Sequence, residues 1–177
     1  KGKKVLLGVT ASIAAYKTAE LVRLFKKAGA SVKVIQTEAS LRFVAPLTLS
    51  TLSENPVQSV LIDKDSGEWN SHVDLGLWAD IFVIAPLTAN TMAKMVIGEC
   101  DNLLLATYLS AKCPVYFAPA MDLDMYKHQS TSDNIKKLES FGNKLIPSGF
   151  GELASGLVGE GRICLLYTSD AADDSLR

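Results

Sequence analysis

The chain has 177 residues, and its 18 lysines and arginines nearly balance 19 aspartates and glutamates, which leaves a net charge of −1. This length fits one domain, and the even charge balance argues against a nucleic-acid partner. Apolar runs such as 81–86 are far shorter than the ~18 residues of a membrane-spanning helix. The three cysteines lack paired spacing and a nearby histidine pattern, so they indicate neither disulfides nor a metal site. We therefore expect a cytoplasmic protein that binds neither membranes nor nucleic acids.

Short apolar strands alternate with helices along the chain. In chain order the predicted elements are a strand at 5–9, a helix at 14–27, strands at 32–36 and 81–85, helices at 88–96 and 102–111, a strand at 115–118, a helix at 133–141 and a strand at 144–146. A polar stretch at 63–71 is predicted to be a long loop. Because the strands are apolar throughout, they are typical of a parallel sheet that helices cover on both faces. We therefore predict a single α/β domain.

Two segments offer small and hydroxyl-bearing residues where a predicted strand ends and a helix begins. Residues 8–17 follow the first strand, and residues 85–94 follow the third. The first N–H groups of a helix lack intrahelical acceptors and carry partial positive charge, so they attract anions, and Ser12 or Thr88 can donate further hydrogen bonds. Parallel sheets bind ligands at the carboxyl ends of their strands. The sequence therefore predicts a phosphate and cofactor cradle at this edge.

Four motifs give the chain a resemblance to a known family. They are GVTASIAAYK at 8–17, PLTANT at 86–91, APAMDLDMY at 118–126 and GELASGLVGEGR at 151–162. In this order and spacing they resemble the flavin-dependent cysteine decarboxylases, above all the branch that acts on phosphopantothenoylcysteine. The resemblance, which runs from about 4 to 162, implies a flavodoxin-like or Rossmann-like sheet and FMN as cofactor. It also implies a homotrimer, or a dodecamer, with active sites between subunits.

The resemblance further implies an activity and a domain organisation. The activity is FMN-dependent decarboxylation of 4'-phospho-N-pantothenoylcysteine to 4'-phosphopantetheine in coenzyme A biosynthesis, by thiol oxidation, loss of carbon dioxide and reduction of the ene-thiol. Residues 1–162 would form the decarboxylase domain, which in the native chain would be fused to a phosphopantothenate–cysteine ligase. Residues 163–177 match no family motif and resemble vector read-through, so we expect a non-native or disordered tail, and Cys164 within it is not expected to act in the site.

Site residues follow from the same resemblance. His72 matches the catalytic histidine of the family. An imidazole can take up and return a proton near neutral pH, which suits that role. Without the resemblance, His72 is interpreted as a residue that caps the segment after the polar loop. The residues that match the FMN site are Ala11, Ser12, Ile13, Thr37, Ser40, Thr88, Ala89, Asn90, Thr91, Ala120 and Met121. Thr37 and Ser40 also fit ordinary helix capping. Asn90 matches a substrate-binding asparagine as well, although the residue type also suits a turn.

Two positions depart from the family pattern. Asp122 stands where the family usually has an asparagine that holds the substrate carboxylate, and two carboxylates in contact repel each other. Asp122 also fits an Asx turn or a helix cap. Ser155 stands where the flap of the family supplies a cysteine, and a serine hydroxyl is a far weaker acid than a thiol. We predict His72, Asn90, Asp122 and Ser155 as the catalytic set, with residues 151–161 as a glycine-rich mobile flap.

Two alternatives keep the fold and the flavin. The first is a related reaction, such as that of the prenyl-FMN synthases or the peptidyl-cysteine decarboxylases, although His72 and the motif at 119–122 count against the prenyltransferase. The second is a non-catalytic regulatory flavoprotein that binds a partner.

Overall fold

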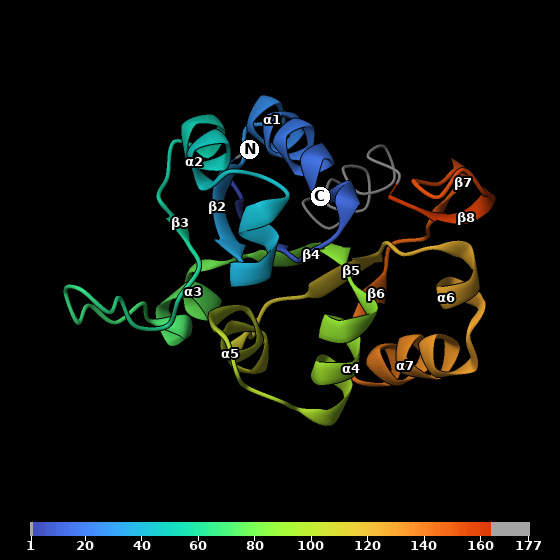
Figure 1. Cartoon of the computed structure of the whole chain (residues 1–177). Helices are drawn as coiled ribbons and strands as arrows, with labels where there is room; N and C mark the ends of the chain where they lie inside the picture. Colours follow the sequence, from blue (N-terminus) through green and yellow to red (C-terminus); the bar gives the residue numbers. More distant parts are fainter. Residues whose placement is uncertain (1, 164–177) are drawn as a thin grey trace.

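Six parallel strands form the sheet at the centre of the computed structural model, which describes residues 2–163 (Figure 1). The strands lie in the order β3-β2-β1-β4-β5-β6. Their bounds are β1 Lys4–Val9, β2 Ser31–Gln36, β3 Val57–Gln58, β4 Ile81–Leu87, β5 Val115–Pro119 and β6 Lys144–Leu145. This is the Rossmann strand order, and without the two-residue edge strand β3 it is also the flavodoxin order. The predicted α/β class and its parallel sheet are confirmed.

The strand order reverses between β1 and β4, which pair directly with each other. In open α/β sheets ligands bind outside the carboxyl ends of the strands at such a switch point. The loops that follow β1 and β4 are the two segments in which the sequence predicts a cofactor cradle. The topology therefore brings both segments to one place.

Helices cover both faces of the sheet (Figure 1). The 3₁₀ helices are η1 Ile13–Lys17 and η2 Glu38–Arg42, and the α-helices are α1 Thr18–Lys27, α2 Pro46–Ser53, α3 His72–Trp78, α4 Ala89–Ile97, α5 Leu103–Ser110, α6 Leu123–Lys127 and α7 Gln129–Ser140. Alternate residues of each strand face opposite layers: Leu7 packs in the core cluster that includes Phe25 of α1, and Leu6 in the one that includes Leu104 of α5. Both layers are thus apolar and fully closed over the central strands.

Two helices begin differently from the sequence prediction. The helix predicted at 14–27 starts as the 3₁₀ helix η1, and the Thr18 hydroxyl donates to the Ala15 carbonyl at 2.6 Å, where α1 begins. The helix predicted at 133–141 begins four residues earlier, because His128 caps it: its Nδ1 accepts from the Ser130 amide at 3.2 Å. Local side-chain hydrogen bonds thus accompany both shifted boundaries, and the elements themselves are as predicted.

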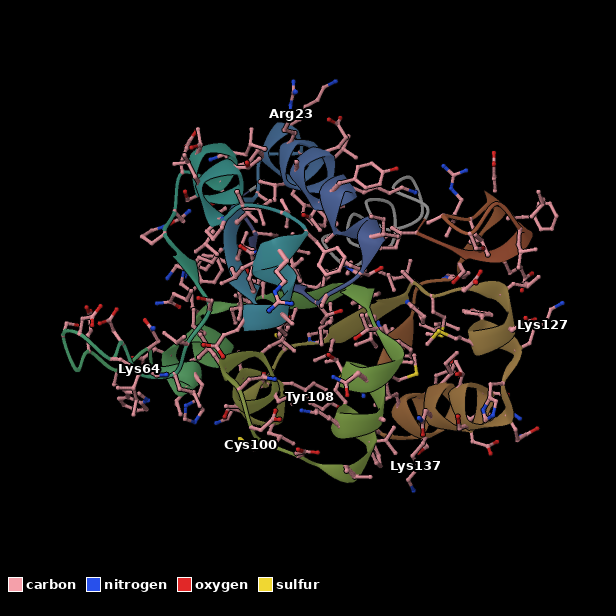
Figure 2. All side chains as sticks on the ribbon, viewed as in Figure 1. Arg23, Lys64, Cys100, Tyr108, Lys127 and Lys137 are labelled. Atoms are coloured by element: carbon pink, nitrogen blue, oxygen red, sulfur yellow. The ribbon has the colours of Figure 1, made fainter. Side chains whose placement is uncertain are left out.

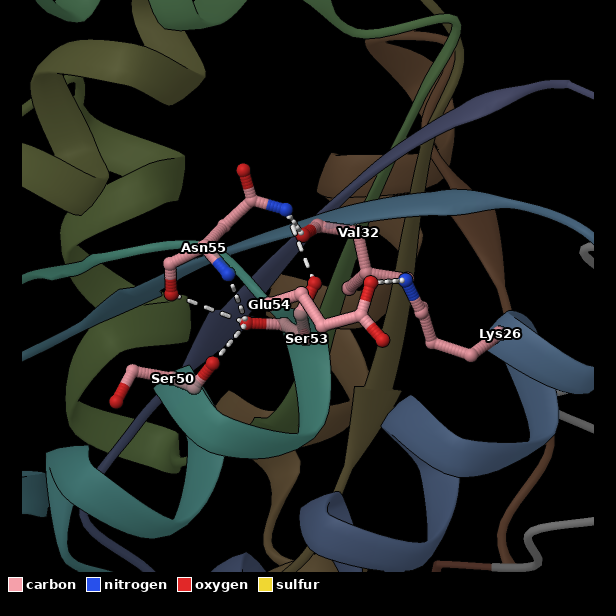
Figure 3. A network of polar contacts seen from close by, with 6 residues as sticks. All are labelled: Lys26, Val32, Ser50, Ser53, Glu54 and Asn55. Atoms are coloured by element: carbon pink, nitrogen blue, oxygen red, sulfur yellow. Dashed lines mark hydrogen bonds and ion pairs between the residues drawn. The ribbon is translucent and has the colours of Figure 1, made fainter.

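The connection from α2 to β3 is fastened by the polar network in Figure 3. Glu54 ends α2 in a left-handed conformation, and its carboxylate accepts from Lys26 of α1 at 2.7 Å. Asn55 donates its side-chain amide to the Val32 carbonyl of β2 at 2.9 Å and to the Ser53 carbonyl at 3.0 Å. The hydrogen bonds of the Asn55 side chain are partly buried, whereas the ion pair of Lys26 and Glu54 is exposed. The Asn55 side chain therefore contributes more to the stability of this connection.

A second, two-stranded sheet lies beside α6 at the margin of the molecule (Figure 1). It is the antiparallel hairpin of β7 Gly149–Glu152 and β8 Val158–Arg162, and we call it the flap hairpin. A Cβ on Gly159 would lie 2.6 Å from a methyl carbon of Leu123, and one on Gly161 would lie 2.5 Å from the Met121 carbonyl oxygen. Only glycines let β8 approach the 121–123 loop this closely.

The described chain ends at Ile163, which is buried in the core cluster beneath α1 with 4% of its surface exposed. The Lys17 Nζ of η1 donates to its carbonyl at 3.0 Å. The remainder of the tail that the sequence sets apart, residues 164–177 with Cys164, lies outside the described residues. Within 2–163 no helix has the length and apolar character to cross a membrane, and no group of three or more His, Cys, Asp or Glu side chains could hold a metal ion.

Burial raises the pKa of the Cys113 thiol.

Candidate functional site

Thr10 joins the loops that follow β1 and β4. Its hydroxyl donates to the Pro86 carbonyl at 2.6 Å and accepts from the Thr88 amide at 3.0 Å, and its own amide donates to the same carbonyl at 3.3 Å. Thr10 is completely buried, so these bonds do not compete with water. Thr10 is not among the site residues predicted from the sequence, although a hydroxyl residue at the first position after a buried strand is a signal for it.

Helix ends beside Thr10 present polar groups to the sheet edge. Thr88 caps α4 and accepts from the Thr91 amide at 3.3 Å, while the amides of Ala89 and Asn90 have no acceptor among the described residues. Ser12 caps η1 and accepts from the Ala14 amide at 3.2 Å. Unpaired amides at the start of α4 form a ready anion site.

A cavity of about 400 Å³ opens over this helix end, and we call it the β2–β4 cavity. Thr37 contributes to its wall; it occupies the N-cap position of η2 but makes no capping bond through its side chain. Two cations also line it, Lys64 from the loop before α3 (Figure 2) and Lys94 of α4, together with two acids, Glu38 and Asp101. A hydrogen bond to Asp101 raises the pKa of Lys94. Of the predicted FMN residues, this cavity is lined by Ala11, Thr37, Thr88, Asn90 and Thr91.

A second cavity of about 630 Å³ lies between η1, the 120–122 loop and the flap hairpin, and we call it the flap cavity. Its charged lining residues are Lys17, Asp122, Glu152 and Arg162. Of the predicted site residues, it is lined by Ser12, Ile13, Ala120, Met121, Asp122 and Ser155. The adjacent residues Ala11 and Ser12 line different cavities, so the loop after β1 runs between the two.

Asp122 and Ser155, the two positions that depart from the family pattern, contact each other. The Asp122 Oδ1 accepts from the Ser155 hydroxyl at 2.8 Å and from the Leu123 amide at 2.9 Å. Asp122 is therefore the N-cap of α6, as the capping alternative predicted, and also holds the tip of the flap hairpin. The serine and the aspartate thus form a complementary donor and acceptor across 33 residues of sequence.

Three predicted site residues line neither cavity. Ser40 is fully buried, and its hydroxyl donates to the Thr37 carbonyl at 2.8 Å, so it stabilises the η2 turn. Ala89 lies in the first turn of α4 and adds only its backbone amide to the site. His72 begins α3, its ring meets Trp69 edge to face with centroids 5.8 Å apart, and its buried Nδ1 has no partner within the described chain.

Comparison with known proteins gives one family and a set of close relatives. A family model described as flavoprotein matches residues 1–163. A probable phosphopantothenoylcysteine decarboxylase of Streptococcus mutans is 42% identical over 168 residues, which cover 94% of each chain. The solved structure of a PPC decarboxylase mutant complexed with pantothenoylaminoethenethiol superposes with a TM-score of 0.84 and 33% identity, covering 98% of both chains.

Other relatives are longer than this chain. A cysteine/cysteine sulfinic acid decarboxylase from an unknown prokaryotic organism is 58% identical over 120 residues, which are 68% of this chain and 33% of that protein. The coenzyme A biosynthesis bifunctional protein CoaBC of Haemophilus influenzae is 41% identical over 162 residues, 92% of this chain and 40% of that protein. The chain thus spans between a third and two fifths of these relatives.

We predict that Thr10→Val lowers the free energy of unfolding by about 2 kcal/mol, because the Pro86 carbonyl and the Thr88 amide lose their shared partner. Thr10→Ser keeps the hydroxyl and removes only a methyl group, so its loss should stay near 1 kcal/mol. Unfolding in urea measures both. Equal losses for the two variants would mean that packing, not the hydroxyl, matters at this position.

We predict that Asp122→Ala speeds hydrogen exchange at the tip of the flap hairpin, residues 153–157, by about fivefold, the equivalent of about 1 kcal/mol for one lost bond. Asp122→Asn is the matched control, since an amide oxygen can still accept from both Ser155 and Leu123. Exchange measured by mass spectrometry should rank the alanine variant alone as fast. Equal exchange rates in the wild type and both variants would show that the hydrogen bond from Ser155 to Asp122 does not hold the hairpin tip.

Proposed function

Because the chain belongs to the flavoprotein family, we propose that it binds FMN and decarboxylates 4'-phospho-N-pantothenoylcysteine to 4'-phosphopantetheine, a step of coenzyme A biosynthesis. The observation that carries the proposal is the pair of cavities on either side of the loop after β1, at the sheet's switch point, both within the roughly 300–1,000 Å³ range of small-molecule sites. The relative from Streptococcus mutans, which matches this chain almost end to end, supports the choice of substrate.

The residues of the β2–β4 cavity fit a flavin phosphate. Unpaired amides at Ala89 and Asn90, the uncommitted Thr37 side chain and the Lys64 ammonium offer donors and positive charge to a dianion. In the flap cavity, the small and apolar wall at Ala120 and Met121 suits a flat aromatic ring. FMN, when bound, would supply the two-electron oxidation of the substrate thiol, which creates the electron sink that accepts the bonding pair as carbon dioxide leaves.

The side chains of the protein itself position the bound molecules and exchange protons with the substrate. Thr10 fixes the two loops that the cofactor would touch, and the flap hairpin, held by Ser155 on Asp122, forms one wall of the flap cavity. One carboxylate oxygen of Asp122 accepts from the Ser155 hydroxyl and the Leu123 amide. Because a carboxylate repels the substrate carboxylate, we assign the binding of that group to Asn90, the neutral amide of the predicted set. His72 takes up and returns the proton.

His72 lines neither cavity, and this favours an active site shared between copies of the chain. We infer a homotrimer, or a dodecamer built from trimers, in which His72 of one copy reaches the cavities of its neighbour. The unpartnered Nδ1 of His72 and the exposed Trp69, Val73 and Leu77 around it are consistent with a surface that a neighbour covers.

The native chain is proposed to continue into a phosphopantothenate–cysteine ligase, as the name of the bifunctional relative from Haemophilus influenzae suggests. Residues 1–162 would then be the decarboxylase domain and residues 163–177 a non-native tail, whose first residue, Ile163, packs in the core. We place the protein in the cytoplasm, because Cys100 and Cys113 are free thiols and suit a reducing compartment.

Purified protein tests the proposed function directly. The sample should show flavin absorbance, and 4'-phospho-N-pantothenoylcysteine should yield carbon dioxide and a product with the mass of 4'-phosphopantetheine. Free cysteine and cysteine sulfinic acid are the competing substrates, since a 58% identical relative is named for them. A protein that takes up no FMN refutes the cofactor, and carbon dioxide from the small amino acids alone refutes the substrate.

We predict that His72→Asn lowers kcat by about 10²–10⁴-fold, because it removes the group that exchanges the proton. FMN content and the oligomer measured by light scattering should not change. His128→Asn is the control, since His128 is exposed and serves only as the cap of α7. Normal turnover in flavin-loaded His72→Asn protein would remove His72 from the mechanism.

A further inference from the structure

Arg162 is a charged residue of the flap cavity that the proposed reaction has not yet used. It is the last residue of β8, and its guanidinium makes no hydrogen bond or ion pair with the described part of the chain. Of the other charged residues of the cavity, Lys17 donates to the Ile163 carbonyl, Asp122 accepts from Ser155 and Leu123, and Glu152 is an acid, which cannot receive an anion. A guanidinium at the wall of a cavity, with its donors unspent, is a candidate anion receptor.

The fold holds the Arg162 side chain in place without using its donors. The side chain lies over Gly151 of β7, where an added Cβ would come within 2.9 Å of Nη1 and 3.1 Å of Cδ. The next residue, Ile163, is buried in the core and its carbonyl is bound by Lys17. The backbone on one side of Arg162 is thereby anchored, and a glycine on the facing strand makes room for the stem.

We propose that Arg162 binds the phosphate of the substrate and makes the flap cavity selective for phosphorylated acyl-cysteines. This assignment rests on the proposed function. The planar guanidinium matches a phosphate with two parallel hydrogen bonds. It does not suit the reacting carboxylate, because a cation there would stabilise the carboxylate anion, whose charge passes to the rest of the substrate as neutral carbon dioxide leaves, and would so raise the barrier. The flavin phosphate has its own donors in the β2–β4 cavity, which Arg162 does not line.

Kinetics with two substrates test the assignment. The substrates are 4'-phospho-N-pantothenoylcysteine and N-pantothenoylcysteine, which lacks only the phosphate. For Arg162→Gln we expect kcat/KM to fall about tenfold with the first substrate and to stay unchanged with the second, and Arg162→Lys should lie between, because lysine keeps the charge without the fork. Arg23→Gln, an exposed arginine on α1 (Figure 2), is the matched control and should change neither value. Equal losses with both substrates, or no loss, overturn the proposal.

A binding measurement separates this proposal from the proposed function. Calorimetry on the FMN-loaded protein compares 4'-phosphopantothenate with pantothenate, and FMN affinity is measured alongside. If no substrate is turned over, but the wild type prefers the phosphorylated probe and Arg162→Gln abolishes only that preference, the reaction is wrong and the phosphate site stands. If substrate is turned over but the preference survives in Arg162→Gln, the function stands and the site is wrong. A loss of FMN affinity in Arg162→Gln would assign the arginine to the cofactor instead.

Discussion

One buried hydroxyl group fixes the geometry of the sheet edge on which the whole site depends. Thr10 bonds the loop after β1 to the loop after β4, and it does so at the point where the strand order reverses. Parallel strands end in unpaired backbone groups, so two such loops would otherwise be free to move apart. With Thr10 satisfied as donor and acceptor, the capped ends of η1 and α4 keep a constant separation. Residues of these two loops line the cavities: the loop after β1 contributes to both, and the loop after β4 to the β2–β4 cavity.

Much of this arrangement is written in local patterns. Uninterrupted apolar runs such as 81–85 identify buried parallel strands, because no face of such a strand meets water. The topology follows from their alternation with helices, and the switch point then brings the two hydroxyl-rich loops together. Residues whose role depends on the backbone of a loop, such as Ser12 and Thr88, could therefore be placed at the sheet edge before the structure was known.

Other features depend on contacts between distant residues, and sequence patterns do not report those. The flap hairpin has few side chains with strand preference, and its position follows from the fit of Gly159 on Leu123. The bond between Ser155 and Asp122 joins segments 33 residues apart, so each residue alone reads as a loss relative to the family. Helix α2 was missed because its sequence, PLTLSTLS, has no polar stripe, and β3 because two residues carry no periodicity. His72 was expected in the site, but it lines neither cavity of the described chain, so its role depends on the proposed assembly with another copy.

The contact of β8 with the 121–123 loop also limits how the flap can change over evolutionary time. At Gly159 and Gly161 any side chain would push against Leu123 or against the Met121 carbonyl, and the loop that would have to yield forms part of the cavity wall. Substitutions at Gly159 and Gly161, on the inner face of the hairpin, should therefore rarely be tolerated. The tip around Ser155 and the outward end at Arg162 carry no such restriction. New substrate preferences in relatives of this chain should arise at these two places, while the seat of the hairpin stays constant.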